Sequence, residues 1–181
     1  TGLRPDRATV VYANRVRQAF PHAPVILGGI EASLRRFAHY DYWDDKVRHS
    51  ILYDAGADLL VYGMGERAIR EIAHALDKGV PVSSLTNVRG TCYRTSEPNA
   101  ATGCVLLPSY SEVYRDKRAY AEAFMAESRE NDAVRGRTLV QPHEKGALVC
   151  NPPQPPLSVE EMDALYALPF TRKPHPSYRE P

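Results

Sequence analysis

Residues 24–29 read Pro24-Val25-Ile26-Leu27-Gly28-Gly29, a short apolar run that ends in two glycines. Such a run suits a buried parallel strand, because strands covered by helices on both faces are apolar throughout. A second run, Ala57-Asp58-Leu59-Leu60-Val61-Tyr62, is also followed by glycines, at Gly63 and Gly65. These two stretches predict two strands of a parallel sheet.

The segments around these strands carry apolar residues at helical spacing. Residues 7–20 predict one helix, Asp44 can cap a second that Gly56 ends, and Glu66 opens a third with Gly79 just past its end. Helices and strands that alternate through short loops are typical of a sheet covered by helices. The expected fold class is therefore α/β, with a Rossmann-like or flavodoxin-like parallel sheet flanked by helices and incomplete in this chain.

The second half of the chain is less regular. We expect strands over 87–93 and 104–107 around a polar loop at 94–103, a helix over 112–130, and a β-hairpin formed by 137–141 and 147–151. The prolines of residues 152–156 exclude helix and regular sheet and favour an extended polyproline segment. Ser158-x-x-Glu161 is a capping box that opens a short helix, which Pro169 ends before an extended tail over 170–181. Residues 1–150 thus form a partial N-terminal α/β domain, and 151–181 form a Pro-rich connector.

Composition excludes several classes of function. The 181 residues carry a net charge of +1, so no overall field attracts nucleic acid or an acidic membrane. The longest apolar runs are far shorter than the ~20 residues of a membrane span. The three cysteines, Cys92, Cys104 and Cys150, are odd in number and widely spaced, which argues against a disulfide framework and for a reducing, cytoplasmic location. No C-x-x-C pair suggests a metal site, and Cys104 and Cys150 lie in apolar runs typical of buried thiols.

The glycines after the two predicted strands have two readings. Glycines at the carboxyl end of a parallel strand let a ligand approach the backbone, where open α/β sheets bind ligands. Gly28-Gly29 can equally form a tight turn, and Gly63-Met64-Gly65-Glu66 can be a turn before a helix that begins with an acid. Neither stretch is a dinucleotide or phosphate-loop motif, and the Glu66 carboxylate would repel a phosphate.

The loop over residues 30–46 is unusually rich in aromatic and charged residues. Functional loops have this composition, and so do loops that dock on another domain, with docking the favoured reading. The candidate recognition or docking residues are Glu31, Arg35, Arg36, His39, Tyr40, Asp41, Tyr42 and Trp43. His39 suits a hydrogen-bonding or acid–base role as well as a structural one.

Several long runs resemble the YgiQ-type radical SAM protein family. They are Gly28-Gly29-Ile30-Glu31-Ala32-Ser33-Leu34-Arg35-Arg36, Ala38-His39-Tyr40-Asp41-Tyr42-Trp43, Lys46-Val47-Arg48, Ala57-Asp58-Leu59-Leu60, Leu106-Leu107-Pro108-Ser109-Tyr110, Asn151-Pro152-Pro153, Glu160-Glu161-Met162-Asp163, Leu168-Pro169-Phe170 and His175-Pro176. In that family an N-terminal region similar to the cobalamin-binding α/β fold precedes a radical SAM barrel. A C-x-x-x-C-x-x-C triad in the barrel ligates a [4Fe-4S] cluster that binds S-adenosylmethionine.

The resemblance implies that this chain is a fragment. It stops at Pro181 before any such triad, so we expect no catalytic residue, no metal ligand and no cofactor in the chain itself. The full-length protein is expected to bind the cluster and to cleave S-adenosylmethionine for a radical reaction on an unknown substrate. The partner of this region would then be the radical SAM barrel of the same polypeptide.

The resemblance also gives the glycines a role. In the cobalamin-binding fold, a loop like Gly28-Gly29 together with Ser33 lines the nucleotide tail of the cofactor. The candidate cofactor-binding residues are therefore Gly28, Gly29, Ser33, Gly63 and Gly65. The chain begins inside the α/β unit, so a cobalamin-ligating D-x-H-x-x-G loop lies outside it, and retention of cobalamin is left open.

Two other readings compete with this one. A non-enzymatic domain could use residues 30–46 to dock on or recognise a macromolecule, whereas a free-standing hydrolase has no supporting motif. An open pocket at residues 28–36 would favour the cofactor reading, and a flat surface would favour docking. The unpaired edge of the sheet and the apolar tail predict self-association of the fragment, or a tail folded back on residues 1–150.

Overall fold

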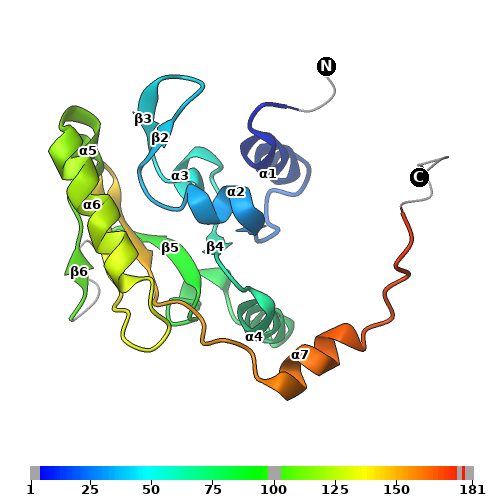
Figure 1. The fold of residues 1–181 in the computed structure, drawn as a ribbon. Helices are drawn as coiled ribbons and strands as arrows, with labels where there is room; N and C mark the ends of the chain where they lie inside the picture. The colour runs from blue at the N-terminus through cyan, green and yellow to red at the C-terminus, as the bar shows by residue number, and fades with distance from the viewer. Residues whose placement is uncertain (1–4, 98–102, 175–176, 178–181) are drawn as a thin grey trace.

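The computed structural model describes residues 5–97, 103–174 and 177 (Figure 1). The helices are α1 (Ala8–Ala19), α2 (Gly29–Leu34), α3 (Ile51–Asp54), α4 (Glu66–Asp77), α5 (Tyr110–Arg115), α6 (Lys117–Glu130) and α7 (Val159–Tyr166), with a 3-10 turn at Val82–Ser84. The strands are β1 (Ile26–Leu27), β2 (His39–Asp41), β3 (Lys46–Arg48), β4 (Leu59–Val61), β5 (Thr91–Thr95), β6 (Val105–Leu106), β7 (Leu139–His143) and β8 (Gly146–Cys150). Parts of the predicted loop over 94–103 and of the predicted tail over 170–181 lie outside the described residues, namely 98–102, 175–176 and 178–181.

Six strands form one mixed sheet in the order β1-β4-β5-β8-β7-β6. β1 pairs with β4 in parallel, as the two apolar runs predict, with Ile26 opposite Leu59. β4, β5, β8 and β7 then pair antiparallel, and β6 lies parallel to β7 at the far edge. The predicted α/β class is confirmed, and the parallel pairing is confined to these two edge pairs. The predicted hairpin is β7–β8, and it is part of the central sheet.

Helices cover both faces of the sheet at its β1–β4 end. Successive residues of a strand point to opposite faces, so Leu60 on β4 packs with α1, α2 and α3, while Leu59 and Val61 pack with α4. On the α4 side the buried contacts are Ala68 and Ile72. The larger core lies on the other face and contains Ala13, Leu27, Ala32, Phe37, Ile51, Leu52, Leu60, Tyr62, Cys92, Leu148 and Cys150.

The segment 39–54 differs from its prediction. A helix beginning at Asp44 is wrong: residues 39–48 form an antiparallel hairpin, β2–β3, with His39 opposite Arg48. Asp45 takes a left-handed φ of 49° in the turn, and a helix begins only after Ser50, whose side chain accepts a hydrogen bond from the Leu52 N–H. Ile51 and Ala55, which share one face of this helix, are buried.

Three further boundaries differ for local reasons. The six residues of α2 were expected to be loop. The predicted helix over 112–130 is two helices, because Asp116 is extended (φ −128°, ψ 119°) and its side chain caps α6. The strand expected at 87–93 begins at Thr91, since Gly90 turns the chain at φ 72°.

The chain after β8 is held to the domain before it departs. The buried Asn151 amide donates to the carbonyls of Thr86 and Val88 and to the Thr91 hydroxyl at 2.9–3.1 Å. The Pro152 carbonyl accepts a hydrogen bond from the Gly90 N–H, and the Gln154 side-chain amide donates one to the Arg89 carbonyl. Arg67 on α4 forms an ion pair with Glu161 on α7. No residue of α7 is buried, and Figure 1 shows the chain beyond it running outward from the body of the domain.

Candidate functional site

The ends of β1 and β4 meet through Ser33. Gly28 precedes α2, and Gly29 begins it with a left-handed φ of 81°. The Ser33 hydroxyl donates to the Gly29 carbonyl at 2.9 Å and accepts from the Gly63 N–H at 3.2 Å. The structure therefore brings four of the five predicted cofactor residues together at the carboxyl ends of the two parallel strands.

Gly65, the fifth residue, lies on the other side of β4. A Cβ there would come within 2.9 Å of Val61, whose side chain packs against α4. Gly65 therefore serves the close approach of α4 to β4. Its position does not line the same surface as Gly28 and Gly29.

The surface beside these glycines is open and apolar. A Cβ at Gly28, Gly29 or Gly63 would meet nothing within 4 Å. Ile30 and Leu34 on α2 are 79% and 71% exposed, and Met64 is 50% exposed. We call Gly28, Gly29, Ile30, Leu34, Gly63 and Met64 the α2 surface. Side chains that point into solvent from a short helix make this a surface suited to contact with protein.

Arg36 points into the protein. Its guanidinium lies 4.9 Å from the Tyr62 ring centroid and 5.2 Å from that of Phe37, and it approaches the Glu127 carboxylate at 3.7 Å. Burial raises the pKa of Glu127 to about 7, although the positive charge of Arg36 opposes this. Arg36 thus joins α6 to the main core and is not free to dock.

The other charged candidates brace the domain internally. Glu31 accepts hydrogen bonds from the backbone and hydroxyl of Thr9 on α1, and pairs with Arg35 at 3.1 Å. Asp41 is buried and accepts from Arg7 at 2.9 Å. Burial lowers the pKa of His39, whose Nδ1 lies 3.1 Å from the Phe37 carbonyl oxygen.

The aromatic candidates lie around the β2–β3 hairpin. Tyr42 and Trp43 are 77% and 79% exposed at its turn, with their rings edge to face at 5.7 Å. The Tyr40 hydroxyl donates to Asp45 at 2.6 Å. Of the predicted docking residues, the aromatic ones therefore remain available to a partner.

Among the described residues, the three cysteines do not gather at one place. Cys92 and Cys150 are buried opposite each other on β5 and β8, and Cys104 lies elsewhere before β6. Within residues 5–97, 103–174 and 177, no group of three or more His, Cys, Asp or Glu could hold a metal ion. In the same part of the chain, no helix is both long and apolar enough to cross a membrane.

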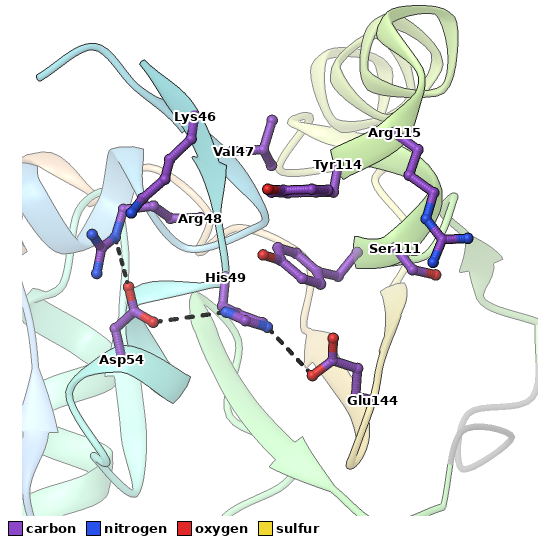
Figure 2. A pocket seen from close by; sticks show the side chains of 10 residues that line it. Lys46, Val47, Arg48, His49, Asp54, Ser111, Tyr114, Arg115 and Glu144 are labelled. Carbon is purple, nitrogen blue, oxygen red and sulfur yellow. Dashed lines mark hydrogen bonds and ion pairs between the residues drawn. The ribbon is translucent and has the colours of Figure 1, made fainter. Parts of the chain in front are cut away.

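A cavity that sequence reasoning missed lies between β3 and α5 (Figure 2). It measures about 490 Å³ and is lined by Lys46, Val47, Arg48, His49, Asp54, Tyr110, Ser111, Tyr114, Arg115 and Glu144. Figure 2 shows Lys46 and Arg48 on β3 across from Tyr114 and Arg115 on α5. The spacing of Tyr110 and Tyr114, four residues apart on one helix face, is the signal in the sequence that could have indicated it.

Comparisons with known proteins match the whole chain. A family model described as Radical SAM N-terminal matches residues 1–181. A UPF0313 protein of Clostridium botulinum is 53% identical over 98% of this chain, which covers 28% of that relative. UPF0313 proteins of Methanocella arvoryzae and Geobacter sulfurreducens are each 53% identical, over 98% and 99% of the chain. The chain covers 30% of each of these two relatives. No solved structure matches the chain.

Proposed function

The chain belongs to the radical SAM N-terminal family, and from that premise we propose that it is a docking scaffold for the radical SAM domain of its own polypeptide. The resemblance to YgiQ-type radical SAM proteins is confirmed by the family match and by the UPF0313 relatives. The chain spans less than a third of the length of those relatives. We propose that the activity of the whole protein rests on residues beyond this region.

The observation that supports docking is the α2 surface. It is an exposed surface at the carboxyl ends of β1 and β4, where open α/β sheets present their functional side. Ile30 and Leu34 would lose water on contact with a partner, each contributing roughly 1.5–3 kcal/mol if fully buried. The occupant we propose is the cluster-binding domain, because it would lie on the same chain and at high effective concentration.

The chemistry belongs to that domain. We propose that it carries a [4Fe-4S] cluster and S-adenosylmethionine, which together supply a radical when bound. This region contributes position: Asn151, Pro152 and Gln154 fix where the connector leaves the sheet, and the Arg67–Glu161 pair holds the start of α7. The region itself performs no chemical step in this proposal, and a cobalamin site at Gly28, Gly29 and Ser33 is not part of it.

Hydroxyl-radical footprinting can test the docking surface. Met64 on the α2 surface and Met125 on α6 are both 50% exposed, so they form a matched pair of probes. In the full-length protein, Met64 should oxidise several times more slowly than in the chain of residues 1–181, while Met125 should oxidise at the same rate in both. Equal oxidation of Met64 in the two proteins would contradict docking at this surface.

A second experiment tests the chemistry separately. The full-length protein, reconstituted with iron and sulfide, should show absorbance near ~400 nm and form 5′-deoxyadenosine from S-adenosylmethionine under reduction. The chain of residues 1–181 treated in the same way should do neither. Iron bound in stoichiometric amounts by the short chain would refute this division of roles.

A further inference from the structure

A second cavity shares part of its lining with the cavity between β3 and α5. The second measures about 720 Å³, reaches Tyr120 on α6, and shares Lys46, Val47, Tyr114 and Arg115 with the first. We call the two together the hairpin groove. Each volume lies in the range of a small-molecule site.

The hairpin groove carries positive charge that the protein does not neutralise. Arg48 is occupied by Asp44 and Asp54 at 2.9 and 3.1 Å. Arg115 and Lys117, by contrast, form no ion pair with any residue in the described part of the chain. The partner of Lys46 is Asp44, at 3.5 Å. The unpaired cations of the groove are therefore Arg115 and Lys117, on its α5–α6 side.

The acidic groups in the groove have other partners. Asp54 pairs with Arg48, and Asp45 accepts the Tyr40 hydroxyl hydrogen bond. Glu144 is 68% exposed in its side chain and lies 3.8 Å from the His49 ring. In the described part of the chain, no carboxylate lies within ion-pair distance of Arg115 or Lys117 on the α5–α6 side of the groove.

Aromatic rings form the wall of the groove on the α5 side. His49 stacks on Tyr110 with ring centroids 3.7 Å apart, and Tyr114 lies 5.9 Å from Tyr110 with 55% of its surface exposed. Figure 2 shows the Tyr114 ring extending from α5 toward Val47 on β3. A ring face open to solvent, in a cavity that an unpaired guanidinium also lines, is suited to a planar ligand that also carries an anion.

The base of this wall is formed by stacked rings and holds a buried polar group without a hydrogen-bond partner. His143 is 9% exposed, stacks on Tyr53 at 4.4 Å and lies parallel to Tyr110 at 5.7 Å. Neither of its ring nitrogens has a hydrogen-bond partner in the described structure. The stack of rings fixes Tyr110 and leaves a neutral donor and acceptor beneath it.

We propose that the hairpin groove binds nucleotides, with a base stacked on Tyr114 and its phosphate on Arg115. The planar ring and the phosphate are shared by a free nucleotide and by a nucleotide within a single strand. The size of the two cavities and the further cations in their lining, Lys46 and Lys117, extend the site past one nucleotide. The net charge of +1 does not oppose this, because the groove concentrates its cations locally.

The test uses the full-length protein and two probes, AMP and a fluorescein-labelled single-stranded tetramer of adenosine nucleotides. Binding is followed by calorimetry and by fluorescence anisotropy at low salt. Tyr114→Ala and Arg115→Ala should each weaken binding by about 5- to 100-fold, the range for loss of one stacked base or one phosphate contact. Arg118→Ala, an exposed cation of α6 that does not line the groove, is the matched control and should bind as the wild type does.

The two probes separate the sources of the ligand. Equal affinity for AMP and the tetramer would assign the groove to a free nucleotide, whereas binding of the tetramer alone would assign it to a single strand. Two results would overturn the proposal: no binding of either probe by the wild type, or unchanged binding by the Tyr114→Ala, Arg115→Ala double variant. Inorganic triphosphate that competes as well as AMP at equal concentration would also overturn it, because the base would then contribute nothing.

Discussion

Replacing Glu127 with glutamine should remove a pH dependence from the stability of the fold. The Glu127 side chain is 19% exposed, lies 3.7 Å from Arg36, and has a pKa raised to about 7 because burial penalises its charged form. In the unfolded chain the pKa of the same carboxyl is near 4.5. Between these values the folded protein holds a proton that the unfolded chain has lost.

The sign follows from that proton. The free energy of unfolding falls as the pH rises from about 4.5 to about 7, and it is level above, because both states are then ionised. From pH 5 to pH 8 the wild type should lose about 2.5 kcal/mol through Glu127, at 1.36 kcal/mol for each pH unit of the interval. Glu127→Gln cannot ionise and should lack this loss.

Urea unfolding of the chain at pH 5 and pH 8 measures the difference. Other titrating groups are present in both proteins, so their effects cancel when the wild type is compared with Glu127→Gln. Glu130→Gln is the matched control, since its hydrogen bonds from Arg137 lower the pKa of Glu130 and keep it charged across this range. That variant should differ from the wild type by the same amount at both pH values. An identical change with pH in the wild type and Glu127→Gln would refute the reasoning.

Three further perturbations test other parts of the structure. Burial lowers the pKa of His143 to about 4, so the free energy of unfolding should fall as the pH drops below about 6.5, by about 2 kcal/mol at pH 5. In urea unfolding, His143→Phe should abolish this fall. An unchanged pH profile in that variant would contradict the burial of a neutral ring. The buried Gln141 amide accepts from the Ala38 N–H at 2.8 Å and donates to the Pro108 carbonyl at 3.3 Å. Gln141→Met should therefore cost about 2–4 kcal/mol in the same assay, with the exposed Gln18→Met as a neutral control. Gly146 has a φ of 116°, and a Cβ there would collide with the Thr95 carbonyl oxygen, so Gly146→Ala should lower the free energy of unfolding by more than about 3 kcal/mol. Gly79 has a φ of 78° but lies in open space, so Gly79→Ala should lower it by only about 1 kcal/mol. Equal melting temperatures for these two variants would contradict the steric explanation.

The elements that the sequence predicts well are those with a pattern and a stop signal of their own. α4 runs from Glu66 to Asp77 between glycines, as its apolar spacing indicates, and α7 begins after the Ser158 capping box. The β2–β3 hairpin was missed because long-range contacts form it. Its buried Asp41 is charged opposite Arg7, which lies 34 residues earlier in the chain, and no local propensity reports such a pair.

The candidate site shows the same division. The glycines after β1 and β4 meet as strand ends of a parallel pair must, and Ser33 joins them. Whether these glycines line a ligand pocket or an open surface could not be predicted from the sequence, because exposure depends on which distant residues cover them. Arg36 was predicted to be a docking residue. It instead packs between Tyr62, Phe37 and Glu127, and these neighbours come together only in the folded domain. The spacing of Tyr110 and Tyr114 marks one face of α5, but no local pattern indicates that β3 lies opposite that face to form the hairpin groove.

The fastening of Pro152 and Gln154 next to the sheet has a consequence for how this protein can change in length. Residues 152–156 form no helix or strand and, if extended as polyproline, advance about 3.1 Å and turn about 120° per residue. Deleting one of them would shift α7 by about one such step and point it in another direction. The count of residues between Gln154 and α7 should therefore be held constant among working members of the family.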